Sequence, residues 1–256
     1  MYILFLSFFL PCELTKDSLR GKLKEKNYRW IMAKKISLIT KILIILFSSL
    51  GLTLSLIFSA EDGYSHPTKR LFYFTGLSNI WIAVCVILIL ILPLSKRFAN
   101  SRESKYFLYL LKYVFTVSIT LTGIIFCAVL APGAKNGGYN AWTLSSVMTH
   151  IIVPLLSIMD FFLDGYRIRL KKIHIIYTTI PPLLYLIFAS ILGAFGFDFG
   201  RGDTFPYFFL NYNSPAGFFG FSNEMPYMIG SFYWIIFVLG VILGIGALYR
   251  RLCNRK

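Results

Sequence analysis

The chain is poor in charged residues, and above all in acidic ones. Of its 256 residues only 14% are charged, with 11 Asp and Glu against 26 Lys and Arg. Hydrophobic residues make up 57% of the chain. A soluble domain of this length needs far more polar surface, so the composition excludes a soluble globular protein and is typical of an integral membrane protein.

Cysteine and histidine are also scarce. The four cysteines show no CxxC spacing, which argues against a disulfide framework and against a zinc site. The sequence also lacks an internal repeat, a low-complexity tract and a Gly-rich phosphate loop. We therefore expect no metal and no cofactor.

Long apolar runs are what the sequence has in abundance. A membrane-spanning helix needs roughly 20 mostly apolar residues to cross about 30 Å of hydrocarbon. Six stretches meet this requirement, namely 37–60, 71–93, 107–131, 143–163, 175–195 and 229–249. The predicted fold is therefore all-α, a polytopic six-helix bundle over residues 37–249 in the cell membrane.

Basic residues alternate between the connections. Eight Lys and Arg precede residue 37, and four lie in each of 94–106, 164–174 and 250–256, whereas 61–70, 132–142 and 196–228 together hold four. This positive-inside pattern places both termini in the cytoplasm. The net charge of +15 is then explained by topology and by contact with anionic lipid headgroups, so we expect no nucleic-acid partner.

The first 36 residues form a basic N-terminal arm in this scheme, and residues 250–256 form a basic tail. Met32 opens the phrase MAKKISLITKILIILF, which is an ordinary start for a membrane protein. Residues 1–31 are therefore interpreted either as an interfacial arm or as an extended start upstream of the true one. We place no function there.

Three charged side chains fall inside or near the ends of the spans. Lys41 and Lys112 are placed to reach the headgroups along their long side chains. Asp160 lies close to the cytoplasmic end of the fourth span, where an interfacial acid facing Arg167 or Arg169 is the expected arrangement.

His150 is the only histidine well inside a predicted span, about 10 Å from its outer end. Ser146 precedes it by four residues and Pro154 follows it by four, so the three share one helical face. Pro154 removes the normal donor to the carbonyl of His150, which loosens the helix there. A neutral histidine bonded to a neighbouring backbone or hydroxyl group is the simpler interpretation, and a catalytic base is the functional one.

The stretch FYFTGLSNIW, residues 72–81, is apolar and aromatic but carries Thr75, Ser78 and Asn79 on one helical face. Gly76 lets another backbone approach closely. Thr75 lies about 6 Å inside the second span, which runs in the same direction as the fourth, so Thr75 and His150 lie at similar depth.

A hydroxyl beside an imidazole is the smallest unit of nucleophilic hydrolysis, because the alcohol is a poor nucleophile until a base takes its proton. Ser78 or Asn79 then orients the imidazole or donates to an oxyanion. In the alternative, Thr75 bonds its own helix backbone and Asn79 joins two helices. Spacing alone favours this alternative.

The phrases FYFTGLSNIW and MTHIIVPLL resemble the androgen-induced and androgen-dependent membrane hydrolases, a family of multi-pass proteins with bacterial relatives. The resemblance implies a six-pass bundle that hydrolyses lipid esters, in animal members the fatty acid esters of hydroxy fatty acids. It implies that Thr75 is the nucleophile and that His150, in H-x-x-x-P, is its base. A third, weaker similarity to the family is the phrase FPYFFLN, residues 205–211, although Phe205 stands where relatives often carry Tyr.

The outer connection 196–228 is long and rich in Phe, Tyr, Gly and Pro. We expect it either to pack over the mouth of the bundle as a lid or to form an aromatic belt in the interface. Pro206, Tyr207 and Asn211 are its candidate substrate-entry residues.

Two other functions compete with a lipid-ester hydrolase. A small-solute transporter is favoured by six spans, Pro181-Pro182 and intramembrane polar groups, but similar halves and an interrupted helix pair are missing from the sequence. A non-catalytic membrane protein is disfavoured because short connections leave little surface for soluble partners. The substrate and the oligomeric state stay open.

Overall fold

The chain is all-helical in the computed structural model, which describes residues 12–61, 63–133, 140–164, 168–200 and 202–255. Residues 1–11 of the expected N-terminal arm lie outside this part of the chain. Within the described ranges, six segments are long and apolar enough to cross a membrane: Ile31–Ile57, Phe74–Leu94, Arg102–Leu130, Leu144–Leu163, Ile173–Ala194 and Ser231–Asn254. The expected fold class of a six-helix membrane bundle is therefore confirmed, with helix ends shifted by a few residues.

Several of these spans are built from more than one helical element. The longer elements are α1 (Cys12–Ile57), α2 (Phe74–Ile91), α4 (Arg102–Ile125), α7 (Val153–Leu163), α9 (Ile180–Ala194) and α10 (Ser231–Asn254). The short α-helices are α3 (Lys96–Asn100), α5 (Ala131–Gly133), α6 (Leu144–Val147) and α8 (Ile173–Tyr177). The 3-10 turns are η1 (Pro67–Phe72), η2 (Leu92–Leu94) and η6 (Phe208–Leu210), and the π-helical turns are η3 (Phe126–Leu130) and η5 (Met148–Ile152).

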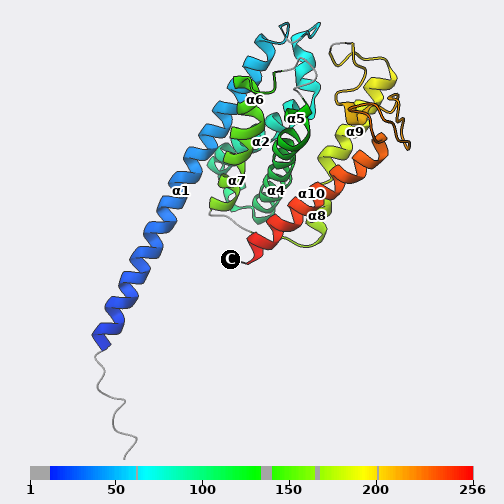
Figure 1. The fold of residues 1–256 in the computed structure, drawn as a ribbon. Helices are drawn as coiled ribbons and strands as arrows, with labels where there is room; N and C mark the ends of the chain where they lie inside the picture. The colour runs from blue at the N-terminus through cyan, green and yellow to red at the C-terminus, as the bar shows by residue number, and fades with distance from the viewer. Residues whose placement is uncertain (1–11, 62, 134–139, 165–167, 201, 256) are drawn as a thin grey trace, which may run out of the picture.

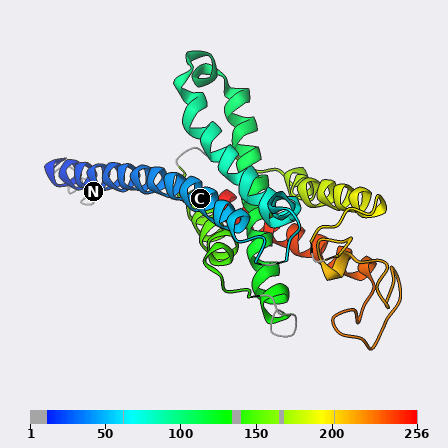
Figure 2. The ribbon, with the colours of Figure 1, turned by 90° about the horizontal axis from the view of Figure 1, so that it is seen from above.

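Helix α4 lies at the centre of the bundle (Figures 1 and 2). Its span is the most buried of the six. Helices α1, α2 and α7 pack on one side of it, and α9 and α10 lie on the other. The start of α1 runs well beyond the other helices, and it lies toward the same end of the bundle as the end of α10 (Figure 1).

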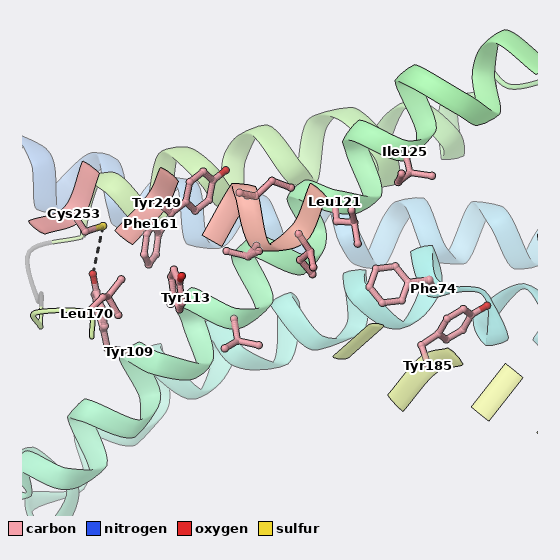
Figure 3. Packing of buried hydrophobic residues seen from close by; sticks show 14 of the residues in the cluster. Phe74, Tyr109, Tyr113, Leu121, Ile125, Phe161, Leu170, Tyr185, Tyr249 and Cys253 are labelled. Atoms are coloured by element: carbon pink, nitrogen blue, oxygen red, sulfur yellow. Dashed lines mark hydrogen bonds between the residues drawn. The ribbon is translucent and has the colours of Figure 1, made fainter. Parts of the chain in front are cut away.

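Aromatic side chains join the central helix to its neighbours. Phe161 of α7 packs between Tyr113 of α4, at a ring-centroid distance of 6.0 Å, and Tyr249 of α10, at 5.9 Å. The Tyr113 hydroxyl donates to the carbonyl of Gly246 at 2.8 Å. Figure 3 shows Phe161 and Tyr249 at one end of this core and Phe74 with Tyr185 at the other.

The charged side chains of the spans form a buried ionic cluster, which we define as Lys41, Lys112, Asp160 and Asp164. Asp160 Oδ1 lies 2.7 Å from Lys41 Nζ, and Asp160 Oδ2 lies 2.6 Å from Lys112 Nζ. Asp164 Oδ2 lies 2.6 Å from Lys112 Nζ and 3.6 Å from Lys41 Nζ. Two positive and two negative charges therefore join α1, α4 and the end of α7.

The expected contacts of these charges were wrong. Lys41 and Lys112 do not extend to headgroups, since they are only 5% and 1% exposed. Asp160 is fully buried between them and does not face Arg169, while Arg167 lies outside the described residues. A buried carboxylate is stable only with close counter-charges and hydrogen bonds, and the two lysines supply them better than an interfacial arginine would.

Two helix irregularities follow from proline. The expected loosening before Pro154 is confirmed as the π-helical turn Met148–Ile152. A second irregularity lies just before Pro181 and Pro182, at Thr178 and Thr179, where α8 ends and α9 begins. Proline lacks an N–H and fits the first turn of a helix, so α9 starts with its prolines at the positions where they cost least.

The connection 196–228 divides into two parts. Phe199, Tyr207 and Phe209 of its first part pack against the main hydrophobic core. In the second part Phe219 and Phe221 are exposed, which suits an interfacial surface. The first part therefore packs on the bundle and the second part exposes aromatic side chains, while closure as a lid stays a prediction.

An ion pair fastens the first part of the connection to the start of α2. Asp198 Oδ2 lies 2.7 Å from Lys69 Nζ, and Asp198 Oδ1 accepts from the Gly200 N–H at 2.8 Å. The hydrogen bond from Lys69 is the main reason why the pKa of Asp198 is lowered. This pairing weakens only when the pH falls through that lowered pKa, so it persists at neutral pH.

Candidate active site

Thr75 is the second residue of α2, directly after the helix begins. Gly76 beside it has no room for a side chain, because a Cβ there would lie 3.0 Å from the carbonyl oxygens of Arg70 and Leu71. The close backbone approach expected at Gly76 is therefore real, and the approaching backbone is that of η1, just before α2. This contact sets the turn that presents Thr75.

The structure brings Thr75 and His150 together. Thr75 Oγ1 lies 3.1 Å from His150 Nε2, although the two residues are 75 positions apart in the sequence. The two helices are thus neighbours, with both side chains at the same depth. A separation of this size is a hydrogen bond between hydroxyl and imidazole.

The second ring nitrogen determines which way that hydrogen bond runs. His150 Nδ1 lies 2.9 Å from the carbonyl oxygen of Ser146. A carbonyl oxygen can only accept, so Nδ1 carries the proton, and in the neutral imidazole Nε2 is then the acceptor. The Thr75 hydroxyl therefore donates to Nε2, which is the arrangement that a general base requires.

A second π-helical turn supports the imidazole from behind. Phe126, the first residue of η3, stacks on the His150 ring with centroids 4.1 Å apart and an interplanar angle of 19°. Phe126 is fully buried and His150 is 9% exposed. Gly123 allows α4 to approach, because a Cβ there would lie 2.9 Å from the His150 carbonyl. Sequence reasoning missed Phe126, since nothing in its local pattern distinguishes it from other aromatic residues in the spans.

The side chains of Asn79 and Ser78 bond to groups other than the imidazole ring, and Ser146 is bonded to the ring through its backbone. Asn79 Nδ2 donates to the carbonyls of Thr75, at 2.9 Å, and Thr149, at 3.1 Å. Ser78 Oγ donates to the Thr75 carbonyl at 3.2 Å and lies 2.9 Å from Thr122 Oγ1. Ser146 reaches His150 through its carbonyl. Asn79 thus joins α2 to the π-turn of His150, and Ser78 joins α2 to α4.

We expect Asn79→Ala to lower the free energy of unfolding by roughly 1–2 kcal/mol, because it removes the donor to the Thr149 carbonyl of another helix as well as to the Thr75 carbonyl of its own helix. Ser157→Ala is the matched control. Ser157 is equally buried, but its hydroxyl donates only within its own helix, to Val153 at 2.7 Å. Unfolding in mixed micelles with increasing dodecyl sulfate measures both. Equal stability of the two variants would contradict a joining role for Asn79.

An apolar pocket opens beside Thr75 and contains about 700 Å³ of empty space, part of it open to the surroundings. Thr75 and Phe74 line its inner end, and Leu183 of α9, which is 38% exposed, lies at its outer side. The remaining wall comes from α4, α9, α10 and η6, mostly with aliphatic and aromatic side chains. His150 does not line this pocket, so Thr75 separates the imidazole from it.

The candidate entry residues of the outer connection are divided by the structure. Tyr207 lines the pocket together with Thr75. Pro206 is buried, and Asn211 makes a local turn in which its Oδ1 accepts from the Asn213 N–H at 3.0 Å. Neither Pro206 nor Asn211 is among the residues that line the pocket.

Tyr207 keeps its proton under physiological conditions. Burial raises the pKa of Tyr207 to about 12, although hydrogen bonds with the Thr75 side chain and with the backbone N–H groups of Thr75 and Phe74 oppose that increase. Its hydroxyl group is therefore a neutral donor at the mouth of the Thr75 site.

Fold and site together define the class of this protein as a polytopic helical membrane protein with a partly buried hydroxyl–imidazole pair at the edge of an apolar pocket. Comparison of the chain with protein-family models, curated proteins and solved structures found no match.

Proposed function

We propose that this protein is an intramembrane hydrolase of lipid esters, in which Thr75 is the nucleophile and His150 is the general base. The observation that carries the proposal is the 3.1 Å contact between Thr75 Oγ1 and a His150 Nε2 that is free to accept a proton. Kinship with the androgen-induced and androgen-dependent hydrolases belongs to the same proposal.

The reaction has two halves. His150 Nε2 takes the Thr75 proton while Oγ1 attacks the acyl carbonyl carbon, and the imidazolium then gives that proton to the leaving alcohol. A water molecule, deprotonated by the same Nε2, next attacks the acyl-threonine. The proton returns to Thr75 Oγ1 as the acyl–oxygen bond breaks and the fatty acid leaves.

The apolar pocket supports an acyl substrate in preference to a polar one. An acyl chain dissolves in the bilayer and can enter such a site laterally, and Leu183, which lines the pocket and is exposed, supports an opening toward lipid. The distribution of basic residues supports a topology with both ends of the chain in the cytoplasm and the Thr75 site in the outer leaflet. Anionic headgroups then contact the basic connections.

The test is covalent capture of the nucleophile. Purified protein in detergent is treated with an alkyl fluorophosphonate, digested and examined by mass spectrometry, and the same preparation is assayed against a panel of lipid esters. We expect the adduct on Thr75 and ester turnover that disappears in the labelled fraction. Labelling of a residue other than Thr75 would overturn Thr75 as the nucleophile. Solute uptake by proteoliposomes without any ester turnover would overturn the hydrolase in favour of a transporter.

A further inference from the structure

The start of α2 lies at the wall of the pocket and begins with backbone N–H groups that have no helical partner. The first backbone hydrogen bond of the helix is from the Leu77 N–H to the Tyr73 carbonyl at 3.1 Å, so Phe74, Thr75 and Gly76 lie ahead of the helical bonding pattern. The Tyr73 side chain does not cap this end, and its hydroxyl donates to the Phe199 carbonyl at 3.4 Å. The positive end of an 18-residue helix therefore lies at the wall formed by Phe74 and Thr75.

A second, independent feature of the same wall is the Tyr185 hydroxyl. Tyr185 of α9 is only 5% exposed, and its ring packs on Phe74 with centroids 5.3 Å apart (Figure 3). It lines the pocket, yet its hydroxyl has no hydrogen-bonding partner among the described residues. A buried hydroxyl without a partner is costly, so it points to a group that binds there.

We propose that the N–H groups of Phe74 and Thr75, together with the Tyr185 hydroxyl, bind the carbonyl oxygen of the acyl group and the carboxylate of the fatty acid that hydrolysis releases. The proposal rests on the proposed function for its catalytic half. A carbonyl carbon attached to Thr75 Oγ1 places its oxygen next to the N–H of the same residue. The negative charge that develops on that oxygen during attack is then stabilised by preorganised donors in a water-poor site.

Tyr207 lies beside the proposed oxyanion site, which consists of the N–H groups of Phe74 and Thr75 and the Tyr185 hydroxyl. Its ring lies 6.3 Å from that of Tyr185, and both residues line the same pocket.

The experiment measures fatty acid binding without requiring turnover. Binding of tritiated dodecanoate and of tritiated dodecanol is compared by scintillation proximity for wild type, Tyr185→Phe and Tyr249→Phe in the same detergent. Tyr249 is the matched control, because it is also 5% exposed but its hydroxyl lies 2.9 Å from Thr120 Oγ1 and it does not line the pocket.

We expect Tyr185→Phe to weaken dodecanoate binding about 10- to 100-fold, as for the loss of a hydrogen bond to a charged group, while dodecanol binding changes less than about twofold. Tyr249→Phe should leave both unchanged. Absence of dodecanoate binding to wild type, or equal losses for acid and alcohol, would overturn the oxyanion site.

The same variants separate this inference from the hydrolase itself. If wild type turns over lipid esters, Tyr185→Phe should lower kcat about 10- to 100-fold with little change in KM. If wild type binds dodecanoate through Tyr185 but shows no ester turnover, the binding site is supported and the proposed hydrolase activity is rejected. Turnover that is unaffected by Tyr185→Phe would retain the hydrolase and reject the oxyanion site.

Discussion

Replacing Thr75 by Ala is expected to reduce lipid-ester hydrolysis to background, because no other hydroxyl is paired with His150 Nε2 among the described residues. His150→Gln should cost about 10²- to 10⁴-fold in kcat, the usual contribution of a general base. Thr75→Ser keeps a hydroxyl at the same place and should retain activity within about tenfold. Steady-state hydrolysis of one lipid ester by equal amounts of folded protein measures all three.

Two matched controls separate catalysis from folding. Thr120→Ala removes another buried threonine hydroxyl of the spans, and His174→Gln removes another buried imidazole, which bonds Tyr106 at 2.9 Å. Both should remain active. Because nucleophile and base act as a unit, the Thr75→Ala, His150→Gln double variant should be no slower than Thr75→Ala alone. Turnover that survives in the double variant would refute the Thr–His mechanism.

The second large effect is expected in the buried ionic cluster. Asp160→Ala removes the carboxylate that contacts both Lys41 and Lys112, leaving two buried ammonium groups with Asp164 alone. Removal of one partner from a buried ion pair costs about 3–5 kcal/mol, because the remaining charge stays desolvated. We expect a loss of that size in the free energy of unfolding, measured in mixed micelles, together with a lower Tm.

A second substitution that restores charge balance distinguishes the electrostatic explanation from simple loss of packing. Asp160→Asn leaves two positive charges against one negative charge, and adding Lys112→Met restores equality with Lys41 and Asp164, which lie 3.6 Å apart. The double variant should therefore be more stable than Asp160→Asn alone. Asp198→Asn, at a partly exposed pair, should cost less than about 1 kcal/mol. A double variant no more stable than the single one would contradict the electrostatic account.

The hydrogen-bonding role of Asn79 shows the limit of pattern reasoning at the site. The four-residue spacing predicted that Asn79 shares a helical face with Thr75, and that Ser146 shares one with His150. Its actual partners, the carbonyls of Thr75 and Thr149, depend on how two distant helices cross. Tyr185 was not predicted at all, because an isolated tyrosine in an apolar span carries no signal until its neighbours are known.

The six spans and the loosened turn before Pro154 could be predicted from the sequence alone. These features depend on hydropathy and on the missing N–H of proline, which act over one or two helical turns. The same local rules made Thr75 and His150 candidates at similar depth.

Which side chains meet depends on the tertiary structure. It placed Thr75 Oγ1 3.1 Å from His150 Nε2, buried Lys41 and Lys112 against Asp160, and formed the apolar pocket beside Thr75. Helix neighbours in a bundle are chosen by close packing and by the need to satisfy every buried polar group. Those requirements join residues far apart in the chain, so no local pattern contains them.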